Sequence, residues 1–274
     1  MRYGWLAFLT DYGYHDGFVA ACHGVIARIV PDARVIDVTH AVPPQDVRHG
    51  AVVLEQTVPY LPASVIVGVV DPGVGSERRG VALQAGESVL VGPDNGLLVW
   101  AADALGGASA AVELTAPEYR LGGDAATFHG RDIFAPAAAH VAAGVPLRAL
   151  GPAVSVEDLV RLPTPRARAR AGVVETEAHL VDHFGNVALA ARADHLNEAG
   201  LAVGDRVDVT VSGGPVHHDV LLGRIFADVA PGEHLVYVDS HGYLSLATNQ
   251  GDAASSLGVE PGDDVRVSRS HAHG

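Results

Sequence analysis

The sequence contains no lysine and only one cysteine, Cys22. A single cysteine excludes an internal disulfide and any metal site built from several cysteines, and it permits an intracellular location, so we expect the protein in the cytoplasm. All 18 basic residues are arginines, against 32 acidic residues, and the formal net charge is −14. Such a charge repels a nucleic-acid backbone, which argues against DNA or RNA as a partner.

Long apolar stretches are also missing. The apolar part of the N-terminal segment is too short for a signal peptide and soon reaches Asp11, and no segment approaches about 18 uninterrupted apolar residues. The sequence therefore predicts a soluble protein with no membrane partner. With 274 residues, of which 48% are hydrophobic, the chain is long enough for two modest domains.

The first part of the chain alternates strand and helix patterns, which predict an α/β domain over residues 1–162 with a mainly parallel sheet and helices on both faces. Ligands of such folds bind at loops that follow the carboxyl ends of strands. Strands are predicted at 6–9, 35–38, 65–70, 81–83 and 89–91. A first helix is predicted between Asp16, which could cap it, and Pro31, which ends it, and further helices are predicted at 46–58, 95–105 and 131–143.

The pattern changes after Gly151. Residues 163–172, PTPRARARAG, are predicted to be a linker because proline and arginine interrupt any regular pattern. An all-β, barrel-like domain is predicted over residues 173–268, followed by an irregular tail at 269–274. The β-type runs that carry this prediction lie at 173–175, 187–190, 207–211, 235–238, 244–247 and 265–267.

Three residues of the first domain are candidates for catalysis or binding. Asp11 follows the first strand, where a carboxylate can accept hydrogen bonds from a ribose diol, and a turn-forming role is equally open. Asp71 and Arg78 can pair across the glycine-rich turn of VVDPGVGSERR and hold a water molecule, or can pair for structure alone. The turn lacks the spacing and the lysine of a phosphate-binding loop.

His129 adds to this set because TFHGRDIFAP places it just before a predicted helix. A histidine near a carboxylate and an arginine is a candidate base or water-orienting group. A hydrolytic metal site made of Asp11, His15, His129 and Asp132 is the rival interpretation, although the spacing matches no known metal motif. We expect no metal and no cofactor.

Seven blocks together resemble the S-adenosyl-L-methionine hydroxide adenosyltransferases, a family related to fluorinating and chlorinating enzymes. The resemblance covers almost the whole chain. It rests on LTDYG, HAVPPQDV, VVDPGVGSERR, VGPDNGLL, TFHGRDIFAP, VDHFGNV and DSHGYLSLATN, in this order.

The resemblance implies a homotrimer whose active sites lie at subunit interfaces, and a reaction that converts S-adenosyl-L-methionine and water to adenosine and L-methionine. It implies that Asp71, Arg78 and His129 handle the water and that Asp11 holds the ribose. The remaining substrate-binding residues that it implies are Asp182, Phe184, Asn186, Phe226, Ser240, His241 and Asn249.

Three alternatives compete with this interpretation: a halide-using enzyme of the same fold, a non-catalytic protein that binds adenosine or S-adenosyl-L-methionine, and a metal-dependent hydrolase. Asp71 stands where the halogenases have an aromatic residue, and Gly130 stands where a serine helps to hold fluoride. His241 replaces an arginine of the fluorinating enzyme. The first two departures argue against halide as the nucleophile.

Overall fold

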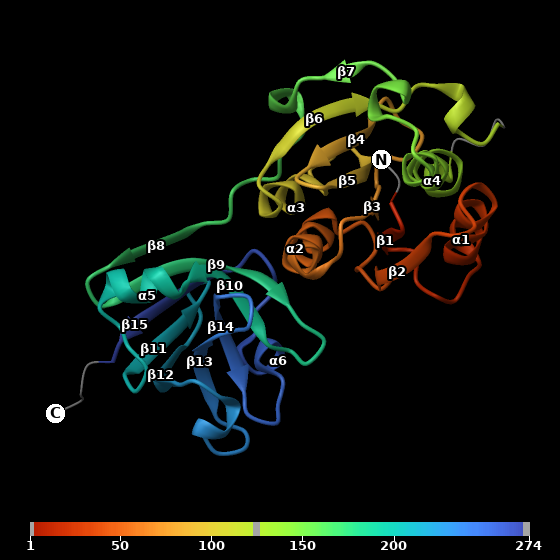
Figure 1. Ribbon diagram of the computed structural model, residues 1–274. Helices are drawn as coiled ribbons and strands as arrows, with labels where there is room; N and C mark the ends of the chain where they lie inside the picture. Colours follow the sequence, from red (N-terminus) through yellow and green to blue (C-terminus); the bar gives the residue numbers. More distant parts are fainter. Residues whose placement is uncertain (1–2, 123–126, 271–274) are drawn as a thin grey trace. The chain divides into compact units, whose positions relative to one another are not determined.

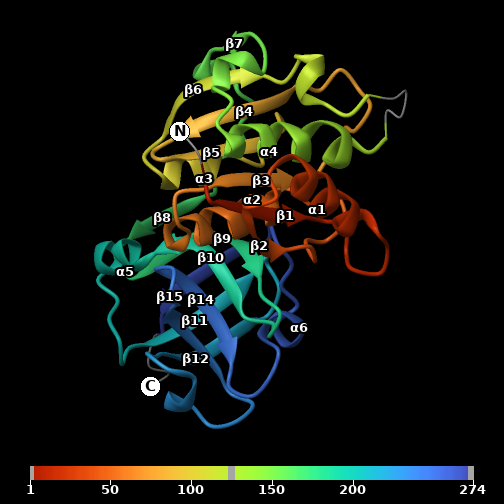
Figure 2. The same ribbon diagram turned by 45° about the vertical axis from the view of Figure 1, so that its right-hand side comes forward.

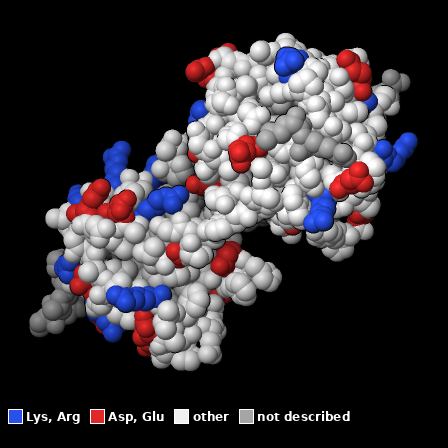
Figure 3. Space-filling model, in the orientation of Figure 1, with Lys and Arg blue, Asp and Glu red and all other residues white. Residues whose placement is uncertain are grey.

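The computed structural model describes residues 3–122 and 127–270 (Figure 1). The chain divides between Leu162 and Pro163 into two compact units. No helix among the described residues is long and apolar enough to cross a membrane. Figure 3 shows arginines interspersed with acidic residues on the face in view, with no extended basic surface among the described residues there.

The first unit is built on a seven-stranded sheet with the order β2-β1-β3-β5-β4-β6-β7. The strands β2, β1, β3 and β5 are mutually parallel, and β4, β6 and β7 extend the sheet through antiparallel pairings. Their bounds are Trp5–Thr10 (β1), Arg34–Thr39 (β2), Val65–Val69 (β3), Gly80–Ala85 (β4), Ser88–Pro93 (β5), Ala108–Glu113 (β6) and Ala153–Val154 (β7).

Helices cover both faces of this sheet, as predicted. Helices α1 (Phe18–Ile29) and α4 (Ala135–Ala143) pack together on one face, and α2 (Val47–Thr57) and α3 (Val99–Ala104) pack together on the other (Figures 1 and 2). Alternate residues of the central strands enter two apolar clusters, Phe8 and Val67 with α1 and α4, and Leu9 and Ile66 with α2 and α3. Strands buried on both faces explain the nearly continuous apolar runs in the sequence.

Three local predictions in this unit were wrong in detail. Gly17, not Asp16, precedes α1, and no side chain caps that helix. The helix predicted from Asn95 begins only at Val99, because the Asn95 amide donates to Val70 O and Gly96 adopts a positive φ of 96°. The helix predicted from Arg131 starts as a π-helical turn, Gly130–Phe134, before α4.

The second unit is a closed barrel of seven strands with β8 added at its edge, and the pairing of β9 with β10 closes it. The strands are Ala167–Arg170 (β8), Val173–Val181 (β9), Val187–Arg192 (β10), Arg206–Val211 (β11), Val216–Leu222 (β12), His234–Val238 (β13), Tyr243–Thr248 (β14) and Asp264–Arg269 (β15). Two short helices, α5 (Ala193–Ala199) and α6 (Ala253–Leu257), accompany them.

Two segments of this unit differ from the sequence interpretation. Part of the predicted linker forms β8, which pairs with β9 from Ala167 to Arg170, so alternating Ala and Arg marked a strand here. Strand β12 was not predicted, because its two histidines and Asp219 hide the apolar alternation. The irregular tail predicted at 269–274 begins too early, because Arg269 is still part of β15, and its residues beyond Ser270 lie outside the described residues.

Candidate active site

The loop after β3 folds so that Arg78 returns to Asp71. Ser76 N donates to Gly73 O, and the Ser76 hydroxyl donates to the same oxygen while it accepts from Arg78 N. Gly75 has a φ of 79°, a conformation that residues with a Cβ atom rarely adopt. The DPGVGSER segment therefore closes on itself and carries the arginine side chain back to the end of β3.

Arg78 joins Asp71 to His129. Its Nε donates to Asp71 Oδ1 at 3.1 Å and its Nη2 donates to Asp71 Oδ2 at 2.5 Å. The same Nη2 lies 2.9 Å from His129 Nδ1, and Nη1 donates to the backbone oxygen of Arg79 at 3.1 Å. The side chains of Arg78 and Asp71 are only 9% and 6% exposed, so the ion pair is largely removed from water.

The hydrogen bonds assign the protonation of this trio. Arginine has no acceptor, so His129 Nδ1 must accept from Arg78, and the neutral ring carries its proton on Nε2. Burial and the charge of Arg78 lower the pKa of His129, which favours that neutral form. Burial raises the pKa of Asp71, although Arg78 opposes the shift by its charge and hydrogen bonds. Asp71 is therefore a stronger base than an exposed aspartate.

A second ion pair, next to the first, has a structural role. Arg79 Nε and Nη2 donate to Asp94 Oδ2, and Nη2 also donates to the backbone oxygen of Asp158. Asp94 Oδ1 accepts from Val160 N, and the Asp94 side chain is 3% exposed. This pair ties the segment before the unit boundary to β5. No local pattern in the sequence indicated that the two adjacent arginines have different partners.

Asp11 lies at the same edge of the sheet as Asp71. Strands β1 and β3 are parallel neighbours with Thr10 opposite Val69, so the two aspartates follow adjacent carboxyl ends. Asp11 Oδ2 accepts from Gln45 N at 2.8 Å, and Gln45 has a positive φ of 68°. The loop before α2 is thus attached to Asp11, which fixes the orientation of this carboxylate.

Tyr12 is a residue of this site that the sequence interpretation missed. Its ring packs against those of Phe18 and Phe128, with centroid distances of 5.8 and 5.6 Å. Burial raises its pKa, and the charges of Asp11 and Asp71 add to that shift, so the hydroxyl stays protonated. A Cβ atom on Gly130 would collide with this hydroxyl. Its position directly after Asp11 was the only available signal.

In the second unit, Asp182 organises the loop between β9 and β10. Its Oδ1 accepts from the backbone N of Phe184 and of Asn186, and its Oδ2 accepts from Asn186 Nδ2. Gly185, between them, has a φ of 81°. This network leaves the Phe184 ring 74% exposed, and the large exposed aromatic side chain is available for stacking on a ligand.

Of the other predicted residues of this unit, Phe226 contacts Tyr237 and Asn249 supports a nearby loop. The Phe226 ring lies 5.3 Å from that of Tyr237, and burial together with the charges of Asp239 and Asp182 raises the pKa of Tyr237 to about 12. Asn249 Nδ2 donates to Val229 O at 2.7 Å, which holds the loop that follows Phe226. Tyr237 was not predicted, and it is the ring against which Phe226 packs.

Ser240 and His241 lie in the exposed turn between β13 and β14. Asp239 Oδ1 accepts from His241 N at 2.9 Å, and Arg192 Nη1 donates to His241 O at 3.2 Å. The backbone of this turn is therefore held from both sides, and both predicted side chains face solvent at its tip.

The rival metal site is not formed. Among the described residues, the one group of His, Cys, Asp and Glu side chains with ligand atoms mutually within 4.8 Å is His23, Asp37 and His40. Asp132 is instead paired with Arg131, at 2.7 Å. Asp11, His15, His129 and Asp132 therefore do not converge on a common point.

Comparisons with known families agree in both units. The family model for the "SAM hydroxide adenosyltransferase N-terminal domain" matches residues 6–151, and the model for the corresponding C-terminal domain matches residues 176–266.

Individual relatives match over nearly their full length. A "(R)-S-adenosyl-L-methionine hydrolase" of Salinispora arenicola is 56% identical over 96% of this chain and 97% of its own. A "Fluorinase" of Actinopolyspora mzabensis is 29% identical over 97% of both chains. The crystal structure of an uncharacterized conserved protein from Thermotoga maritima superposes with a TM-score of 0.89 at 35% identity and covers 96% of this chain and 100% of that one.

Proposed function

The chain belongs to the S-adenosyl-L-methionine hydroxide adenosyltransferase family, and we propose that it hydrolyses S-adenosyl-L-methionine to adenosine and L-methionine with a water held by Asp71, Arg78 and His129. The observation that carries the proposal is the buried contact of Arg78 with both other side chains.

The reaction needs positioning more than leaving-group assistance. The water oxygen forms a bond to ribose C5′ as the C5′–S bond breaks, and that electron pair stays on sulfur, so methionine leaves as a neutral thioether. One water proton must be accepted. Because the sulfonium charge disappears during the reaction, a largely dry site that fixes the water behind C5′ supplies most of the required acceleration.

The geometry suggests separate roles for the three side chains. His129 Nδ1 is occupied by Arg78, so its Nε2–H group can donate to the water oxygen and orient it. Asp71, whose pKa burial raises, accepts the proton. Arg78 holds the carboxylate and the ring at fixed positions and stabilises hydroxide-like charge as the proton leaves. The proton then passes to solvent.

Substrate binding is proposed for groups in both units. Asp11 holds the ribose hydroxyls, with its orientation fixed by Gln45. The exposed Phe184 ring and Phe226 hold adenine, and the loop residues Asp182, Ser240 and His241 hold the amino-acid end. Asn186 and Asn249 act by holding these loops in place. We propose a homotrimer with active sites at subunit interfaces, on the strength of family membership, and a cytoplasmic location stays a prediction.

The proposal is tested by incubating EDTA-treated protein with S-adenosyl-L-methionine in ¹⁸O-water, first without and then with chloride, and analysing products by mass spectrometry. Adenosine labelled at the 5′-oxygen, with methionine released in equal amount, is the expected result. Unchanged substrate would indicate a binding protein, and a halide-dependent product would indicate a halogenase.

The proton-transfer assignment predicts a pH profile. kcat/KM is expected to be constant above neutral pH and to fall in acid, because protonated Asp71 cannot accept the water proton. Protonation of His129 occurs below its ordinary pKa of 6.5 and also ends its contact with Arg78. Rates measured from about pH 4 to about pH 9 give the profile.

His129→Gln shows whether Asp71 or His129 causes the fall of kcat/KM in acid. Glutamine can accept from Arg78 and donate to water, so the variant is expected to retain more activity than His129→Ala and to keep the acid limb. Loss of the acid limb in His129→Gln would instead make His129 the proton acceptor.

Gly130→Ser tests whether the Tyr12 hydroxyl fills the space next to Gly130. The new side chain collides with the Tyr12 hydroxyl, so we expect turnover to fall about tenfold and stability by about 1–3 kcal/mol, with no gain of fluoride use. Gly24→Ser is the control, since a Cβ atom there meets nothing within 4 Å. Fluoride-dependent product formation by Gly130→Ser would contradict the assignment of Tyr12 to this space.

Subunit mixing tests the proposed trimer. Asp71→Asn impairs the first unit and Asp182→Ala impairs the second. If each site combines the first unit of one subunit with the second unit of the next, every mixed trimer has one intact site of its three. Random mixing in equal amounts makes about three quarters of the trimers mixed, so about a quarter of wild-type activity is expected to return. Mixing Asp71→Asn with His129→Ala, both in the first unit, is expected to restore nothing. Equal behaviour of both mixtures would contradict interface sites.

A further inference from the structure

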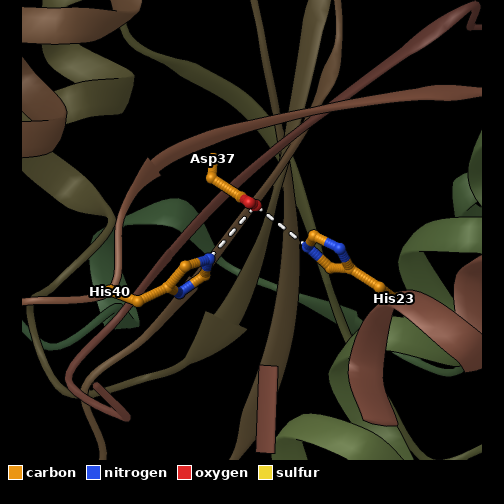
Figure 4. A group of neighbouring side chains, drawn as sticks. All are labelled: His23, Asp37 and His40. Carbon is orange, nitrogen blue, oxygen red and sulfur yellow. Dashed lines mark hydrogen bonds and ion pairs between the residues drawn. The ribbon is translucent and has the colours of Figure 1, made fainter. Parts of the chain in front are cut away.

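His23, Asp37 and His40 form a cluster that the proposed reaction does not use. The cluster joins three segments: His23 lies on α1, Asp37 on β2, and His40 directly after β2. His23 Nε2 lies 2.9 Å from Asp37 Oδ1, and His40 Nε2 lies 3.1 Å from the same oxygen (Figure 4). Both imidazoles thus direct a nitrogen to one carboxylate oxygen.

The His40 nitrogen is the unusual member of this cluster. The His40 side chain is 0% exposed, and among the described residues its Nε2 makes no contact that meets hydrogen-bond geometry, although it lies 3.1 Å from the Asp37 carboxylate. A buried polar atom without a well-aligned hydrogen bond costs free energy, so its retention calls for an explanation. The atom points at the cluster, where a bound cation would be its partner (Figure 4).

The spacing of the ligand atoms is compatible with a zinc site. With metal–ligand bonds of about 2.0–2.2 Å, ligand atoms of a tetrahedral site are about 3.3 Å apart. The two contacts to Asp37 Oδ1, at 2.9 and 3.1 Å, are within a few tenths of an ångström of that separation, and all three ligand atoms lie within 4.8 Å of one another. The side chains of His23 and Asp37 are each 33% exposed, which gives access from solvent and leaves a fourth position for water.

The surroundings also match a metal site. His40 Nδ1 lies 2.7 Å from the buried hydroxyl of Thr10, which accepts from Tyr12 N. If His40 Nδ1–H donates to Thr10, the Nε2 lone pair is directed at the cluster, and such a partner commonly orients a metal-binding histidine. Phe8 packs against both rings, at centroid distances of 4.9 Å to His40 and 5.8 Å to His23, and limits their rotation.

We propose that His23, Asp37 and His40 bind one Zn²⁺ ion per chain, and that the ion stabilises the end of the sheet that carries Asp11 and Tyr12. Two imidazole nitrogens and one carboxylate oxygen are a ligand set that zinc accepts. The ion has no part in the attack on substrate. It acts through His40, whose backbone oxygen accepts from Gly13 N at 2.7 Å and whose ring contacts Tyr14.

His271 and His273, near the end of the sequence, could bind zinc themselves. Both are therefore replaced by alanine in every sample. EDTA-treated protein is dialysed against ZnCl₂, and bound zinc is counted by mass spectrometry. One zinc per chain is expected, with Co²⁺ giving the visible absorption of a tetrahedral site. Zinc at 100 times its Kd is expected to raise the Tm of the first unit by about 5–10 °C.

His23→Ala and Asp37→Asn are expected to weaken zinc binding at least about 100-fold, since each removes a direct ligand. Neither side chain is fully buried, so these variants test binding without emptying the core. His218→Ala is the matched control, because His218 lies 3.3 Å from Asp208 but belongs to no three-residue group among the described residues.

Two results would overturn the proposal: no stoichiometric zinc in the parent protein, or unchanged affinity in His23→Ala and Asp37→Asn. The cluster would then be a hydrogen-bonded contact only. Hydrolysis by EDTA-treated protein is a separate measurement, so failure of the zinc site and failure of the proposed reaction give different results.

Discussion

Asp71→Asn is expected to lower kcat for S-adenosyl-L-methionine hydrolysis by about 10³-fold and to change substrate affinity little. Asparagine keeps the shape of the side chain and can accept one hydrogen bond from Arg78, but it cannot take a proton from water. The comparison uses kcat from product formation and Kd from equilibrium binding, because KM alone does not separate the two effects.

Asp94→Asn is the matched control for this variant. Both aspartates pair with adjacent arginines, and their side chains are similarly buried, at 6% for Asp71 and 3% for Asp94. Each substitution leaves an arginine without its charged partner, so both variants are expected to lose stability, up to about 3–5 kcal/mol. Only Asp71→Asn is expected to lose turnover. A rate within tenfold of wild type in Asp71→Asn would remove Asp71 from the proton transfer.

Arg78→Lys is expected to lower kcat by about 10²–10³-fold, although the charge is kept. The guanidinium makes four contacts at once, two to Asp71, one to His129 and one to the backbone of Arg79. A lysine ammonium cannot reproduce this planar arrangement, so at least one of the two side chains loses its fixed orientation. Single-turnover kinetics separates this effect from product release.

Arg79→Lys is the control for that substitution. The Arg79 guanidinium contacts Asp94 and the backbone of Asp158. Loss of these contacts in Arg79→Lys is expected to lower the Tm, with turnover largely retained. Equal losses of turnover in Arg78→Lys and Arg79→Lys would mean that the trio contributes only to the stability of the loop.

The sequence was sufficient to predict which polar residues follow the strands, but it was a poor guide to the distant side chains that they contact. Asp11 and Asp71 were recognised because each follows a short apolar run, a local signal that survives in one sequence. Arg78 was recognised because it lies only seven positions after Asp71, across a glycine-rich turn. His129 lies 51 residues from Arg78, and its place beside the pair came from family resemblance, with residue patterns alone leaving a metal site open.

The sequence by itself determined the two-part organisation, the α/β and all-β characters of the parts, and the turn that returns Arg78 to Asp71. These features depend on periodicity and turn chemistry, which act over a few residues. Tertiary structure decided which side chains meet. The order β2-β1-β3 brings His40 next to Thr10, and helix packing brings His23 to Asp37 and the Tyr12 hydroxyl to Gly130. Such contacts depend on strand order and helix placement, which no local pattern encodes.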